Sequence, residues 1–344
     1  MLFRRGAVTF VALLSISVIA LAVLSPDGLE KIRVPFAEQE PENSISGRVG
    51  GDGPVLVVKI DDTSAAHPQI GLEDADLIYI EQVEGGSTRL AAIFSSKIPT
   101  RVGPVRSARI SDIELLEQYG RVGFAYSGAQ RKMYPVIEEA NLHDLGAQRN
   151  SPTIYTTDPN RISPYAMVLR ADLLMELAAS RNLEFAQSKN MGWKFGNAPE
   201  SGEEVTSVEV SWPTSSYSAV WSPSESRWLL NYRKAANIAD SGQHLGASTF
   251  VIQLVSITDS IYKDKVGGVT PFTATVGSGR GYVLRDGKSI PALWSRPSPT
   301  DGTTWKTIDG DEIAFAKGQI WVALTDKEPV FTHKSADAAN TGSK

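Results

Sequence analysis

Three arginines within nine positions form the stretch of this sequence best suited to chemistry. Arg101, Arg106 and Arg109 lie in the segment RVGPVRSARISDIE, with Ser107 between the last two. A guanidinium group presents N–H donors in a planar fork that matches a carboxylate or a phosphate. Arg106, Ser107 and Arg109 also directly precede a predicted helix. The first backbone N–H groups of a helix lack partners and favour negative charge. The pattern therefore predicts an anion-binding site.

The same arginines have a structural alternative. Glu81, Glu84 and Asp112 lie close to them in the sequence, and ion pairs with these carboxylates would tie strands to the helix without any ligand. Asp112 also lies at the expected start of the helix, where its charge offsets the positive field. The sequence leaves both interpretations open.

A second set of polar residues surrounds a tight connection at Gly85-Gly86. In the segment EQVEGGSTR, Glu84 precedes these glycines and Arg89 follows them, between two predicted strands. Glu81 or Glu84 could act as a general base or hold a cation, whereas a cross-strand pair between Glu84 and Arg89 is the structural alternative. The candidate catalytic base is Glu84, and the candidate ligand-binding residues are Arg89, Arg106, Ser107 and Arg109.

The composition limits the other kinds of chemistry. No cysteine occurs among the 344 residues, which excludes disulfides, thiolate metal sites and cysteine nucleophiles. The four histidines form no HExxH motif, and Asp61 and Asp62 after the first predicted strand are more typical of caps or turns than of a metal site. We predict neither a metal nor a cofactor. The formal net charge of −5 argues against sequence-independent binding of nucleic acid.

The elements expected to position these residues belong to two folded regions. From residue 54 to 197, short β-branched runs alternate with helical patterns, which predicts an α/β or α+β domain with a mixed sheet. Ser111 and Glu114 have the spacing of a capping box, so a helix is expected to begin at Asp112. A longer helix is expected directly after Ser163, with a proline in its first turn.

From residue 198 to 332 the pattern changes to short aromatic and β-branched runs separated by turns. This pattern predicts an antiparallel β-rich domain, either a sandwich or barrel-like. Asp286-Gly287 is expected to close a hairpin. Trp294, Trp305 and Trp321 are expected in the core or on a sheet face, although an exposed pair could stack on sugar rings.

Residues 1–25 have the character of a membrane-targeting segment. Arg4 and Arg5 precede a run from residue 6 to 24 without a charged residue. As a helix this run would span about 28 Å, close to the roughly 30 Å hydrocarbon core, which favours a retained single transmembrane helix that serves as a signal anchor. An A-x-A-like pattern inside the run leaves signal cleavage and secretion as the alternative. The arginines predict that the bulk of the chain is extracytoplasmic.

Two further segments have compositions that are poor in residues to bury. Residues 26–53 are expected to form a flexible tether, because their second half is rich in Pro, Gly, Ser and acidic residues. Residues 333–344 are small and polar, which predicts a disordered tail.

The segment PQIGLEDADLIYIEQVEGGSTRLAAIF, followed by VGPVRSARISDIELLEQYG, resembles the YerB-like lipoproteins. These form an envelope family of Gram-positive bacteria with a domain of unknown function in two parts. The resemblance covers residues 54–325, and GSGRGYVLRDGKSIPALW and GQIWVAL look like the second, β-rich part. It implies a location at the cell membrane, with a protein anchor in place of the lipid because a lipobox cysteine is absent. The family brings no catalytic residues; the pattern by which it is recognised includes Glu84, Arg89, Arg106, Ser107 and Arg109.

The sequence therefore predicts an extracytoplasmic, membrane-anchored binding module. Its arginines would hold an anionic cell-wall component or the acidic segment of an envelope protein, so Arg106→Ala should weaken wall binding in a salt-dependent way. The alternative is an enzyme that acts on phosphorylated or acidic envelope glycans, with Glu84 as base and the arginines stabilising charge, although no residue marks a nucleophile. A third interpretation makes the polar set a folding network and places function on the β-rich domain.

Overall fold

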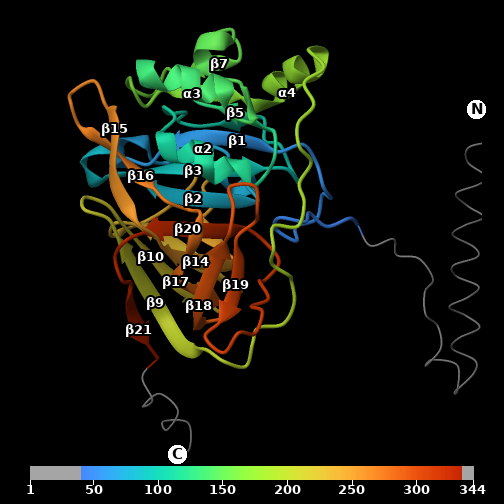
Figure 1. Ribbon diagram of the computed structural model, residues 1–344, viewed down its shortest axis with the longest axis vertical. Helices are drawn as coiled ribbons and strands as arrows, with labels where there is room; N and C mark the ends of the chain where they lie inside the picture. The colour runs from blue at the N-terminus through green and yellow to red at the C-terminus, as the bar shows by residue number, and fades with distance from the viewer. Residues whose placement is uncertain (1–39, 335–344) are drawn as a thin grey trace, which may run out of the picture. The chain divides into compact units, whose positions relative to one another are not determined.

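The computed structural model of the protein describes residues 40–334 (Figure 1). The first region contains β1 (Leu56–Asp61), β2 (Leu77–Gln82), β3 (Thr88–Phe94), β4 (Arg101–Val102), α2 (Ile110–Glu117), β5 (Val122–Ala125), α3 (Tyr134–Glu139), β6 (Leu142–Asp144), β7 (Tyr155–Thr157), β8 (Met167–Arg170) and α4 (Ala171–Ser180). Its single-turn 3-10 helices are η1 (Ser64–Ala66), η2 (Leu72–Asp74), η3 (Glu84–Gly86), η4 (Arg131–Met133) and η5 (Ala147–Arg149).

The second region consists of strands and the loops that join them. These strands are β9 (Glu203–Ser211), β10 (Ser216–Ser222), β11 (Arg227–Tyr232), β12 (Ala235–Ala236), β13 (Gly246–Ala247), β14 (Thr249–Leu254), β15 (Ile257–Lys263), β16 (Val269–Thr273), β17 (Gly277–Arg285), β18 (Lys288–Arg296), β19 (Thr304–Thr307), β20 (Ile320–Thr325) and β21 (Val330–His333).

One mixed sheet of sixteen strands runs through both regions, in the order β12-β11-β10-β9-β18-β17-β14-β20-β2-β3-β1-β5-β6, with β13, β19 and β21 attached at its sides. Strand β1 shows why the sequence folds this way. Leu56, Val58 and Ile60 point into one hydrophobic cluster and Val57 into the other, because alternate residues of a strand face opposite sides. Both faces of the sheet are therefore covered at this strand, as expected for a mixed sheet within an α/β region.

Strand β20 joins the two regions of the sheet. It lies between β14 and β2 and runs parallel to both, with Trp321 opposite Phe250 and Ile78. The expectation of an antiparallel C-terminal region is wrong at this strand. The strand is a continuous apolar run buried on both faces, and such a pattern does not indicate whether its neighbours run parallel or antiparallel to it. Elsewhere in the region the pairing is antiparallel, as in β9 with β10 and β17 with β18.

The helix that follows the arginines begins earlier than expected. Helix α2 starts at Ile110, with Arg109 as its N-cap, and the backbone N–H of Arg109 donates to Asp112 Oδ2 at 2.6 Å. The predicted capping box of Ser111 and Glu114 is wrong because both side chains face β16 and the chain beyond it. Ser111 Oγ accepts the N–H of Thr273 at 2.9 Å, and Glu114 likewise accepts backbone N–H groups of that segment.

The second predicted helix begins later than expected. Residues 167–170 form β8, which pairs with β7 and β4, and α4 begins only at Ala171. Strand pairing at this point overrides the local helical spacing, because helix propensity is weak compared with tertiary contacts.

The local predictions in the β-rich region are confirmed. Asp286 and Gly287 have φ angles of 51° and 73°, as a two-residue hairpin connection requires, and they join β17 to β18. Trp294, Trp305 and Trp321 are all buried, which favours their role as core residues over that of a sugar-stacking surface.

The N-terminal boundary of the fold lies before residue 54. Asn43 and Ile45, which fall in the expected tether, are buried, and Trp193 Nε1 donates to Ile45 O at 3.0 Å. Residues 41–53 thus pack on the domain. This segment contains the apolar Ile45, and Asn43 Oδ1 accepts the backbone N–H of Ile45 and so stabilises the local turn. The predicted anchor, residues 26–39 of the predicted tether and residues 335–344 of the predicted tail lie outside the described residues, whereas His333, the first residue of that tail, belongs to β21. Within residues 40–334, no helix has the length and apolarity needed to cross a membrane.

Candidate functional site

Of the arginines singled out from the sequence, Arg89, Arg106 and Arg109 converge on one cavity of about 790 Å³, whereas Arg101 is exposed in β4 and does not line it. Arg89 lies in β3, Arg106 and Arg109 lie in the segment before α2, and η3 and the β15–β16 hairpin complete the wall. Figure 1 shows that hairpin beside α2 and β3. All five candidate residues line the cavity: Glu84, Arg89, Arg106, Ser107 and Arg109. Its volume is that of a site for a small molecule or for the end of a larger one.

Arg89 is the buried cation of this cavity. The residue is 7% exposed, and its Nη1 donates to Ser107 O at 2.8 Å. Among the described residues, no carboxylate lies within ion-pair distance of its guanidinium. Burial and the nearby charges of Arg109 and Arg106 together lower the pKa of Arg89 to about 9, against the opposing effect of Glu84 and Asp61. A buried charge without a counterion is unfavourable, so this arrangement suits an anion supplied from outside the protein.

Arg106 and Arg109 differ from Arg89, because each has a carboxylate partner. Arg106 Nε pairs with Asp61 Oδ2. Arg109 donates to Glu84 Oε2 from Nε at 2.9 Å and from Nη2 at 2.7 Å. Arg109 and Glu84 therefore form an ion pair within the protein, which was the structural alternative to ligand binding for the arginines. The expected cross-strand pair between Glu84 and Arg89 does not form, because Arg109 reaches this carboxylate instead.

Glu84 is poorly placed to act as a base. Thr270 Oγ1 donates to its Oε1, so both carboxylate oxygens have partners. Burial alone would raise the pKa of Glu84, but the charge and hydrogen bonds of Arg109 bring it below the ordinary value. A carboxylate with a lowered pKa accepts protons weakly near neutral pH.

Glu81 and Asp112, the other acids considered as arginine partners, pair with Lys59. Lys59 Nζ lies 2.8 Å from Glu81 Oε1 and 2.6 Å from Asp112 Oδ1, and all three side chains are buried. Burial raises the pKa of Glu81 to about 7, with the neighbouring Asp112 adding to the rise against the opposing effect of Lys59. This triad joins β1, β2 and α2. Sequence analysis missed Lys59, although its single charge within an apolar strand was a usable signal.

The two adjacent aspartates at the end of β1, Asp61 as its last residue and Asp62 directly after it, have separate roles. Asp61 lines the cavity and pairs with Arg106, whereas Asp62 is buried on the other side. Asp62 accepts the hydroxyl of Tyr217 at 2.6 Å and the Nε2 of Gln69 at 3.1 Å. Asp62 is therefore a structural residue that links the first region to β10.

The start of α2 does not contribute to the cavity as expected. None of residues 110–112 lines it, and the N–H of Arg109 is occupied by Asp112. The cavity gains instead three exposed cations that sequence analysis missed: Arg131, Lys263 and Lys265. The last two come from the β15–β16 hairpin, so the site is built from both regions of the chain. In total, six cationic and three carboxylate side chains line it.

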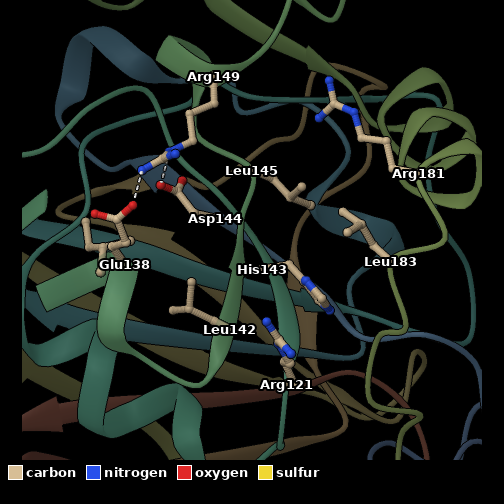
Figure 2. Close-up of a pocket in the computed structure, with 10 residues that line it drawn as sticks. Arg121, Glu138, Leu142, His143, Asp144, Leu145, Arg149, Arg181 and Leu183 are labelled. Atoms are coloured by element: carbon tan, nitrogen blue, oxygen red, sulfur yellow. Dashed lines mark ion pairs between the residues drawn. The ribbon is translucent and has the colours of Figure 1, made fainter. Parts of the chain in front are cut away.

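A second cavity of about 570 Å³ lies beside β6, between α3 and the end of α4. Figure 2 shows Arg149 directed at Asp144 and Glu138, with nitrogen–oxygen distances of 2.5 and 3.7 Å. Arg121 and Arg181 also line it. None of the residues predicted from the sequence lies here, and Arg149 is already neutralised, so the first cavity is the stronger candidate.

Two family models match consecutive parts of the chain. Residues 42–184 match "Protein of unknown function (DUF3048) N-terminal domain", and residues 208–322 match "Protein of unknown function (DUF3048) C-terminal domain". The chain belongs to the DUF3048 family. The resemblance seen in the sequence is thereby confirmed. Within the DUF3048 matches, Arg89, Arg106 and Arg109 fall in the N-terminal domain and Lys263 and Lys265 in the C-terminal domain.

A relative and a solved structure extend this result. The Bacillus subtilis (strain 168) protein named "Putative lipoprotein YerB" is 22% identical over 300 residues, which cover 87% of this chain and 88% of the relative. The crystal structure of YerB from Bacillus subtilis matches with a TM-score of 0.71 and 17% identity, over 84% of this chain and 99% of that chain. The similarity shows that the DUF3048 fold is shared.

Proposed function

We propose that this protein is an extracytoplasmic binding module of the cell envelope, which holds an anionic cell-wall component through Arg89, Arg106, Ser107 and Arg109. The observation that carries the proposal is the state of Arg89. Its guanidinium is buried at a cavity, without a carboxylate partner among the described residues. Its one hydrogen bond is to Ser107 O, so most of its N–H groups have no acceptor among the described residues, and an anion from outside the protein would supply both the acceptors and the compensating charge.

The envelope location is supported by the relative and by the N-terminal sequence. The relative carries the name "Putative lipoprotein YerB", and lipoproteins are attached to membranes by a lipid. The present chain has no cysteine to carry a lipid, but it has an uncharged run from residue 6 to 24 behind two arginines. We propose that this run anchors the protein as a single-pass helix, with secretion after cleavage as the alternative.

The enzymatic alternative has less support. It requires Glu84 to accept a proton, but this carboxylate is bonded to Arg109 and Thr270 and its pKa is lowered. The arginines could stabilise charge in a reaction as well as in a complex, yet the described lining of the cavity offers no activated nucleophile. Binding therefore explains more of the site than catalysis does.

The test is retention of the full-length protein, solubilised in neutral detergent, on purified Gram-positive cell walls. Arg89→Gln should weaken retention about 30-fold or more, because charge-assisted hydrogen bonds contribute roughly 1.5–3 kcal/mol each. Arg106→Ala should weaken it less, and more strongly at low than at high ionic strength. Arg280→Gln is the matched control, because Arg280 is exposed and does not line the cavity. Equal retention of Arg89→Gln and the unmodified protein would refute the proposal.

A further inference from the structure

The cationic side chains of the cavity form two groups that differ in burial. The inner group comprises Arg89, Arg106 and Arg109, whose side chains are largely buried. The outer group comprises Arg131, Lys263 and Lys265, which are exposed. Both groups line the same cavity, and the outer group is the more exposed to solvent.

Each group has uncompensated positive charge. In the inner group, Asp61 and Glu84 neutralise two of the three arginines and leave Arg89. In the outer group, no carboxylate of the described chain lies within ion-pair distance of any of the three cations. The nearest acid in sequence, Asp264, uses Oδ1 to accept the N–H groups of Val266 and Gly268 at 2.9 and 2.7 Å. That carboxylate therefore stabilises the hairpin turn and forms no ion pair with Lys263 or Lys265 beside it.

The hairpin that carries the lysines is fixed to the inner part of the site. Thr270 Oγ1 donates to Glu84, the partner of Arg109, and the N–H of Thr273 donates to Ser111 Oγ of α2 at 2.9 Å. The base of the hairpin is thus attached to the partner of Arg109 and to the helix that follows Arg106 and Arg109. The hairpin that carries Lys263 and Lys265 therefore has a defined position relative to these two arginines, as a ligand with spaced charges requires.

The cavity wall also carries uncharged polar side chains beside its apolar ones. Thr63, Ser107 and Gln130 contribute hydroxyl and amide groups to the cavity wall. Ser107 Oγ has no hydrogen-bond partner among the described residues, and such groups are suited to the hydroxyls of a sugar or polyol unit.

Building on the proposed function, we propose that the ligand is the end of a linear, hydroxyl-rich polyanion with at least two acidic groups in series. The inner group binds the terminal anion at Arg89, and the outer group binds the next anion along the chain at the hairpin lysines. A phosphodiester-linked polyol and a uronate-linked glycan share this chemistry. The cavity would then distinguish a polymer from a single small anion.

The test compares ligands with one charge and with several, by calorimetric titration of the full-length protein in neutral detergent at low ionic strength. The phosphate probes are glycerophosphoglycerol and a short poly(glycerol phosphate), and the uronate probes are galacturonate and trigalacturonate. The variant Lys263→Ala/Lys265→Ala should bind the preferred oligomer about five- to tenfold more weakly, as expected for two exposed ion pairs. Its affinity for the matching single-charge probe should stay within about twofold. Whichever oligomer binds more tightly identifies the source of the anion.

A matched control and four further outcomes make the test decisive. Lys234→Ala/Lys306→Ala removes the same charge from exposed positions outside the cavity, and it should bind both probes normally. Equal affinity of the unmodified protein for oligomer and single unit would overturn the inference, as would an equal loss for both probes in the hairpin variant. Tighter binding of an oligoglutamate peptide would also overturn it, in favour of an acidic protein partner. If Arg89→Gln binds every probe normally, the proposed function itself fails.

Discussion

Replacement of Arg89 by methionine should make the protein more stable while it removes ligand binding. Methionine keeps about the length of the aliphatic part of the arginine side chain and carries no charge, so the substitution removes a buried guanidinium that lacks a carboxylate partner in the described chain. Most substitutions at buried positions destabilise a protein. The opposite sign is expected here because the native residue is held in an unfavourable environment.

The size of the effect follows from the pKa of Arg89, which is lowered from its ordinary value to about 9. At about 1.4 kcal/mol for each pKa unit, this lowering sets an upper limit of about 5 kcal/mol on the cost of the charged form. The variant also loses the hydrogen bond to Ser107 O, and replacement of buried charges by apolar side chains typically gains about 1–4 kcal/mol. We therefore expect about 2 kcal/mol, or roughly 3–6 °C in Tm.

The pH dependence of this gain has a definite sign. The unfolded arginine binds its proton more tightly than the folded one, so the penalty is complete below the folded pKa of about 9. It decreases only as the pH rises above that value. The stabilisation by Arg89→Met should therefore be constant near neutral pH and smaller in strongly alkaline solution.

The assay is urea unfolding of both proteins at neutral pH, with Arg296→Met as the comparison. Arg296 is fully buried, but its guanidinium donates to Thr275 Oγ1 and to the carbonyl oxygens of Glu114, Pro299 and Asp301. Its removal leaves acceptors without donors and should cost more than about 3 kcal/mol. A loss of stability for Arg89→Met comparable to that for Arg296→Met would show that Arg89 is a structural residue, and would refute the reasoning.

Three other substitutions test the surroundings of the cavity. Lys59→Met should destabilise the protein by about 3–5 kcal/mol in urea unfolding, because it leaves Glu81 and Asp112 buried without their cation; a neutral effect would contradict the triad. Stability should decrease as the pH rises from the ordinary glutamate pKa through about 7, since the folded state holds the Glu81 proton more tightly; Glu81→Gln should flatten this dependence, and an unchanged slope would assign it to another group. Glu84→Gln should strengthen anion binding several-fold in calorimetric titration, because it frees Arg109; weaker binding would mean that Glu84 holds Arg109 in its binding position.

The sequence was informative where a feature depends on neighbouring residues. The hairpin at Asp286-Gly287 follows from residues that tolerate positive φ, and the burial of Trp321 follows from its apolar surroundings. The convergence of Arg89 with Arg106 and Arg109 was also predictable in outline, because these residues lie at the ends of adjacent elements.

The pairing of charges could not be predicted in the same way. Glu84 had Arg89 and Arg109 within reach in sequence, and only the register of β2 with β3 and the position of η3 decide between them. The lysines of the β15–β16 hairpin enter a cavity formed by residues far earlier in the chain, a contact that no local pattern encodes. The capping box of α2 was misassigned because Ser111 and Glu114 serve the tertiary contacts of that hairpin.

The place of β20 in the sheet has a consequence for how the chain is made. Its neighbours β14 and β2 are both synthesised earlier, and β2 precedes it by about 240 residues. Until residues 320–325 emerge, the edges of both neighbours remain open to other chains. Because contacts so distant in sequence form slowly, the nascent protein has to keep these edges apart until its last strands arrive. A chaperone that shields them during synthesis or export would therefore raise the yield of folded protein.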